Sequence, residues 1–68
     1  MRKLTTNGKI SIYKLDKNEG FRKSSKFAVI NVQTEKYLGN NISVDNMDYE
    51  CKTLEEARHY MYIWSEIV

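Results

Sequence analysis

The clearest structural signal in this chain is a helix start near its C-terminal end. Thr53 stands three residues before Glu56, the spacing of a capping box in which the hydroxyl accepts a backbone N–H and the acid reaches back to the cap. Glu55 and Glu56 also lie where the helix dipole favours negative charge. Apolar residues then recur at three- and four-residue spacing, with Tyr60 and Ile67 beside them: Leu54, Ala57, Met61, Trp64 and Val68. We therefore predict one amphipathic helix whose apolar stripe lies on a sheet.

A first strand is predicted from Lys9 to Leu15. Within it, Ile10 and Ile12 alternate with residues expected to point outward, such as Ser11. A period of two indicates a strand that is buried on one face and exposed on the other. Residues 16–24 follow as a polar, basic connecting loop.

The remaining strands are predicted downstream of this loop. The short, β-branched run Phe27–Val32 favours a central strand covered on both faces. Lys36–Leu38 is expected to return, Gly39–Asn41 to turn, and Ile42–Val44 to form a further edge strand. The predicted fold is α+β, with a three- or four-stranded antiparallel β-sheet and one C-terminal α-helix packed on one face. Residues 1–68 are expected to form a single domain.

The sequence predicts neither a disulfide nor a structural metal site to stabilise so small a core. Cys51 is the only cysteine, so no intramolecular disulfide can form, and no His and Cys cluster has zinc-site spacing. Packing must hold the fold, and a homodimer, which we expect, would add to it. The sequence has neither the apolar run of a signal peptide nor the ~20 apolar residues of a membrane span. A cytoplasmic protein without a membrane partner is expected.

Charge is distributed unevenly along the sequence. Residues 1–26 contain eight basic and two acidic residues, a net charge of +6. Residues 27–68 contain three basic and seven acidic residues, a net charge of −4. Such polarity bears on partners and association rates rather than on the fold.

Groups for catalysis are scarce. Cys51 and the single histidine, His59, are a poor thiol–base pair, because one precedes the helix and the other is expected on its outward face. Asp45, Asp48 and Glu50 lack the full ligand set and glycine of a calcium loop. We predict a non-enzymatic protein with no catalytic residue, no metal site and no cofactor.

An acidic, tyrosine-bearing surface is the first candidate site. Five acidic residues fall within twelve positions, from Asp45 to Glu56, and Tyr49 and Tyr62 are expected to be exposed. The candidate partner-binding residues are Asp45, Asp48, Tyr49, Glu50, Glu55, Arg58, His59 and Tyr62. The matching function is a small protein-binding module, of the kind that phages or mobile elements encode to occlude or inhibit a host protein. A solvated loop with ordinary helix-start acids is the competing interpretation.

The alternative function is nucleic-acid binding by the basic N-terminal third. Cations neutralise phosphates and aromatic rings stack on bases, and here the cations surround one phenylalanine. The candidate residues are Lys14, Lys17, Phe21, Arg22, Lys23 and Lys26. Against this stand a pI of 8.7, below the range of dedicated nucleic-acid domains, and the competing interpretation of a solvated loop with Phe21 folded onto the core.

Overall fold

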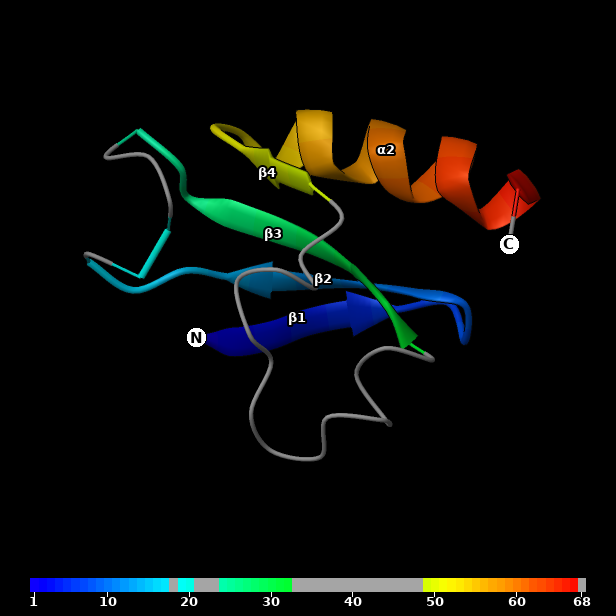
Figure 1. The fold of residues 1–68 in the computed structure, drawn as a ribbon, viewed down its shortest axis with the longest axis horizontal. Coiled ribbons are helices and arrows are strands. Elements are labelled where there is room, and N and C mark those ends of the chain that lie inside the picture. Colours follow the sequence, from blue (N-terminus) through cyan, green and yellow to red (C-terminus); the bar gives the residue numbers. More distant parts are fainter. Residues whose placement is uncertain (18, 21–23, 33–48, 68) are drawn as a thin grey trace.

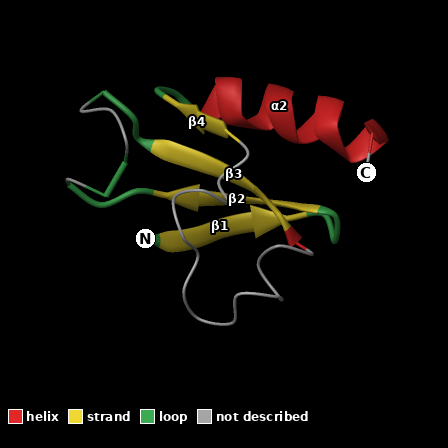
Figure 2. Cartoon of the chain, in the orientation of Figure 1, coloured by secondary structure: helices red, strands yellow, loops and turns green. Residues whose placement is uncertain are grey.

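The computed structural model describes residues 1–17, 19, 20, 24–32 and 49–67. Its strands form one antiparallel sheet in the order β1-β2-β3-β4, and a single helix follows the last strand (Figures 1 and 2). The element bounds are β1 Arg2–Thr6, β2 Ile10–Lys14, β3 Phe27–Asn31, β4 Tyr49–Cys51 and α2 Leu54–Ile67. The α+β prediction, a sheet with a C-terminal helix packed on it, is confirmed.

A tight turn joins β1 to β2. Gly8 has φ of 90°, a backbone conformation that side chains with a Cβ rarely adopt. Asn7 Oδ1 accepts hydrogen bonds from the backbone N–H groups of Lys9 and Ile10, both at 2.9 Å. Gly8 thus supplies the backbone conformation of the turn, and the Asn7 side chain supplies its hydrogen bonds.

β1 is absent from the sequence-based prediction, which placed the first strand at Lys9–Leu15. All five β1 residues are exposed, so the segment lacks the apolar alternation by which strands are recognised. The signal that marks it is the Asn7-Gly8 turn, which closes a hairpin onto the correctly predicted β2.

Pairing of β2 with β3 creates two buried layers. Ile12 pairs with Val29 and Tyr13 with Ala28, so alternate residues of both strands share a face. The cluster on the helix side contains Ile10, Ile12, Val29, Cys51 and Ala57, and the opposite cluster contains Tyr13, Leu15, Ala28 and Ile30. The prediction of a central, doubly covered β3 is confirmed by its three buried middle residues.

β2 is likewise buried on both faces, which corrects the expected half-exposed strand. Ser11 is fully buried and Tyr13 is 8% exposed. The Ser11 hydroxyl donates to Thr6 Oγ1 at 3.0 Å, so its burial leaves no unsatisfied donor. A small polar residue can therefore occupy a position that the alternation pattern assigns to solvent.

The helix begins as predicted. The backbone N–H of Glu56 donates to Thr53 Oγ1 at 3.1 Å, and that of Ala57 donates to the Thr53 carbonyl at 3.1 Å. Ala57 is fully buried, and four partly buried residues pack with it against the sheet: Leu54, Tyr60, Met61 and Trp64.

Other predicted elements lie outside the described residues. These are the strands Lys36–Leu38 and Ile42–Val44 and the turn Gly39–Asn41. β4, a three-residue strand that the sequence did not predict, pairs antiparallel with β3 through Phe27 opposite Cys51. Within the part of the chain described here, no helix has the length and apolar character needed to cross a membrane.

The Gly8→Ala variant tests the hairpin turn. An alanine Cβ at this position would meet no atom within 4 Å, so its cost is the backbone conformation itself. We expect a loss of about 1–2 kcal/mol in the free energy of unfolding, measured by denaturant titration. Gly8→Asn should lose less, because Asn tolerates positive φ better. If Gly8→Ala were as stable as the wild type, the turn assignment would be contradicted.

Candidate functional site

The residues considered for catalysis are placed unfavourably for it. Cys51 is 2% exposed, and burial, with smaller contributions from the charges of Glu56 and Glu50, raises the pKa of its thiol to about 11. His59 is exposed on α2, with its ring beside that of Tyr60. In residues 1–17, 19, 20, 24–32 and 49–67, no three His, Cys, Asp or Glu side chains are grouped to hold a metal ion.

The raised pKa of Cys51 predicts a specific alkaline sensitivity. A thiol whose pKa is higher in the folded state stabilises the fold below its usual pKa of 9.0, and this contribution disappears as pH rises to about 11. Between these values the wild type should lose more unfolding free energy than Cys51→Ala, which lacks the thiol. Chemical denaturation across this pH range measures both proteins, and parallel curves would refute the prediction.

Tyr49 is half-buried rather than exposed, contrary to expectation. Its ring lies 4.0 Å from that of Tyr60, centroid to centroid, and meets the Trp64 ring edge-on at 5.9 Å. A hydrogen bond with the Tyr60 side chain, followed by burial, raises the pKa of Tyr49. Tyr49 therefore serves to pack β4 against α2.

The other members of the predicted acidic surface do not form one patch. Glu50 stands between Tyr49 and Cys51 on β4, so its side chain points to the face opposite the helix. Asp45 and Asp48 lie outside the described residues. The members that the structure does bring together are the exposed α2 residues Glu55, Arg58, His59 and Tyr62.

A pocket of about 250 Å³ lies beside β4. Its lining consists of Ser24, Ser25, Tyr49, Glu50, Cys51, Lys52 and Glu56. Two carboxylates and one ammonium group give this pocket no single sign of charge. It therefore offers no defined recognition of an anion or a cation.

Basic side chains converge along the β1 side of the sheet. Arg2 on β1 pairs in register with Lys14 on β2, which places two cations side by side on the face that carries the helix. Lys3 pairs with Tyr13 on the opposite face, where its Nζ lies 5.9 Å from the ring centroid. Sequence reasoning missed Arg2 and Lys3 because it missed β1.

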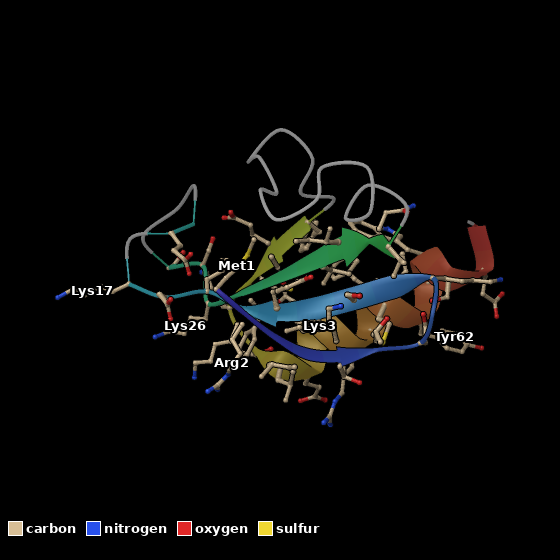
Figure 3. The ribbon with its side chains drawn as sticks, turned by 90° about the horizontal axis from the view of Figure 1, so that it is seen from below. Met1, Arg2, Lys3, Lys17, Lys26 and Tyr62 are labelled. Carbon is tan, nitrogen blue, oxygen red and sulfur yellow. The ribbon has the colours of Figure 1, made fainter. Side chains whose placement is uncertain are left out.

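Two further cations extend this group beyond the strand ends. Lys26 precedes β3 and lies between the end of β2 and β4: its carbonyl accepts from the Leu15 N–H at 2.9 Å, and its own N–H donates to the Cys51 carbonyl at 2.9 Å. Figure 3 shows Lys17 and Lys26 projecting from the same end of the sheet as Arg2. We call Arg2, Lys3, Lys14, Lys17 and Lys26 the cationic edge; the other predicted nucleic-acid residues, Phe21, Arg22 and Lys23, lie outside the described residues.

Two carboxylates close in the chain to Lys17, those of Asp16 and Glu19, pair with the amino terminus. The Met1 amino group lies 3.3 Å from Asp16 Oδ2 and 2.7 Å from Glu19 Oε2. Its hydrogen bond lowers the pKa of Glu19. The side chains of Arg2, Lys14, Lys17 and Lys26 form no ion pair with any carboxylate that the structure describes.

Acidic residues occur on both sides of the sheet. Because β1 and β4 are opposite edges of the sheet, Glu50 on β4 lies away from β1, whereas Glu55 precedes Arg58 by three residues and Tyr62 by seven and so shares their side of α2. Asp16 and Glu19 are close in the chain to Lys17, so the charge asymmetry of the sequence is reproduced only in part across the sheet. Lys52, exposed between β4 and α2, is a cation on the β4 side.

One side of α2 faces the β1–β2 hairpin. Asn7 Nδ2 donates to Ser65 Oγ at 2.6 Å, and Lys9 Nζ donates to the Ser65 carbonyl at 3.4 Å. Arg58, Tyr62 and Ser65 are spaced by four and three residues, so they share this side of the helix. Arg58 and Tyr62 therefore lie on the β1 side of α2, with Tyr62 toward the turn of the β1–β2 hairpin (Figure 3).

Comparison with known proteins gives no family for this chain. No family model matches it, and no curated protein or solved structure is significantly similar to it.

Proposed function

We propose that this protein is a small binding domain that holds nucleic acid on its cationic edge. The observation that carries the proposal is the side-by-side placement of Arg2 and Lys14 on paired strands, with Lys17 and Lys26 extending from the same end. Cations that neutralise phosphates release condensed counterions, and this release drives binding whatever the sequence.

Two further features support nucleic acid over the acidic surface favoured by the sequence. The cations of the edge named above, Arg2, Lys14, Lys17 and Lys26, lack ion-pair partners among the described carboxylates, so a phosphate can approach them without displacing an internal pair. The acidic set, in contrast, is divided between Glu50 on one face of the sheet and residues on the outer side of α2. In this proposal the domain binds nucleic acid and catalyses no reaction.

Charge reversal with a matched control tests this proposal. Arg2→Glu combined with Lys14→Glu should weaken oligonucleotide binding strongly, measured by fluorescence anisotropy across a salt series. The slope of log K against log salt should fall by about 0.9 for each duplex phosphate contact removed, or about 0.7 on a single strand. Lys52→Glu reverses one exposed cation on the β4 side, the same change in net charge as Arg2→Glu alone, and should bind almost as the wild type does, whereas Arg2→Glu should bind more weakly.

Two results would contradict the proposal. One is the absence of wild-type binding to both single-stranded and duplex oligonucleotides at low salt. The other is an equal loss in Lys52→Glu, which would show that net charge rather than the cationic edge is responsible. Circular dichroism and thermal melting of each variant confirm that the fold is retained.

A second candidate is the protein-binding module predicted from the sequence, acting through the outer side of α2. Exposure favours it: of three large exposed hydrophobic residues in the described chain, Tyr62 and Ile63 lie on this helix. Tyr and Arg are frequent at binding hot spots, and Arg58 stands one turn from Tyr62. On this account the domain would occlude or inhibit the protein it binds.

The second candidate is tested by a variant that leaves the cationic edge intact. Glu55→Ala with His59→Ala removes two exposed α2 side chains that take no part in the proposed phosphate contacts. If a protein partner is captured by the wild type and by Arg2→Glu/Lys14→Glu, but lost by this variant, the second candidate is supported. If capture is instead lost in Arg2→Glu/Lys14→Glu and kept in the Glu55→Ala/His59→Ala variant, the second candidate is contradicted.

A further inference from the structure

We propose that the nucleic acid bound on the cationic edge is single-stranded and that one of its bases stacks on Tyr62. This inference rests on the proposed function and adds the class of nucleic acid and a residue that recognises it. It starts from the position and exposure of a single aromatic ring.

Tyr62 is the most exposed large hydrophobic residue described, at 69%. The other Tyr, Trp and Phe rings of the sheet and helix are at least half-buried: Tyr49, Tyr60 and Trp64 pack on one another, Phe27 is half-buried, and Tyr13 is buried. Tyr62 makes no ring contact with another described aromatic residue. Its ring is therefore available to a planar partner.

Tyr62 lies near the turn of the β1–β2 hairpin, at the other end of β1 from Arg2 (Figure 3). Arg2 lies at the start of β1, and the Asn7–Ser65 hydrogen bond holds the helix against the turn at the other end of β1. Figure 3 shows Tyr62 beside this hairpin end and Arg2 at the opposite end of the strand. β1 itself spans roughly 13 Å between Arg2 and Thr6, at about 3.3 Å per residue.

Along the helix Tyr62 has a cation one turn before it and the exposed acid Glu66 one turn after it, and a second cation approaches from the β1–β2 hairpin. Arg58 precedes Tyr62 by one turn, and the Lys9 ammonium lies 3.4 Å from the carbonyl of Ser65, which follows it by three residues. A backbone that runs from Arg2 toward Lys9 would thus place its bases near an exposed ring. An aromatic platform between phosphate-binding cations is the arrangement by which proteins hold single strands.

A duplex cannot use this ring in the same way. Its bases are stacked and paired, so their faces are covered, whereas every base of an unpaired strand has a free π-face. Stacking on Tyr62 would therefore add affinity for single strands only, and the cations would add affinity for both forms.

Three helix variants test the inference with labelled single-stranded and duplex oligonucleotides of the same sequence. Tyr62→Ala should weaken single-strand binding about tenfold and leave duplex binding within about twofold. Tyr62→Phe, which keeps the ring, should retain single-strand affinity. Ile63→Ala, an exposed neighbour, is the matched control and should behave as the wild type does.

Failure of this inference is distinguishable from failure of the proposed function. If Arg2→Glu/Lys14→Glu abolishes binding but Tyr62→Ala weakens neither form, or both equally, the single-strand inference is overturned and the cationic edge stands. If the wild type binds neither form at low salt, both proposals fall. A Tyr62→Phe variant as weak as Tyr62→Ala would also overturn the stacking role, because the ring alone should suffice.

Discussion

The pairing of β1 with β2 determines where the candidate binding residues lie. It brings Arg2 beside Lys14, residues far apart in the sequence, and its Asn7-Gly8 turn reaches Ser65 on α2. The same hairpin therefore fixes one border of the cationic edge and the side of the helix that faces it. Without this pairing, the N-terminal cations would belong to an unpaired tail with no common surface.

Burial of β2 and β3 on both faces allows β1 to remain exposed. Ile12 and Val29 fill the layer under α2, and Ala28 and Ile30 fill the opposite layer. No β1 side chain belongs to either buried cluster. Its cations thus avoid the cost of burying charge. The basic residues and the irregular register near Lys3 also make β1 a poor template for a strand from another molecule.

The sequence predicted the elements whose signal is local and left out those whose pairing is tertiary. The helix was found because Thr53 and Glu56 form a start signal and Ala57 belongs to an apolar stripe. β1 and β4 were missed because one is fully exposed and the other has three residues, so neither shows a period. Of the candidate sites, charge polarity was visible in the sequence. The partial burial of Tyr49 was not visible in the sequence, because it depends on contacts with Tyr60 and Trp64.

The proposed function requires that ligand binds on the β1 side of the sheet. Backbone amide NMR during titration with a single-stranded oligonucleotide tests this directly, because each strand reports separately. The account predicts concentrated shift changes in β1, at Lys14 and along Arg58 to Tyr62, with β4 and the Glu55–Glu56 turn unaffected. Shift changes centred on β4 and the start of α2, or spread evenly over the chain, would contradict it.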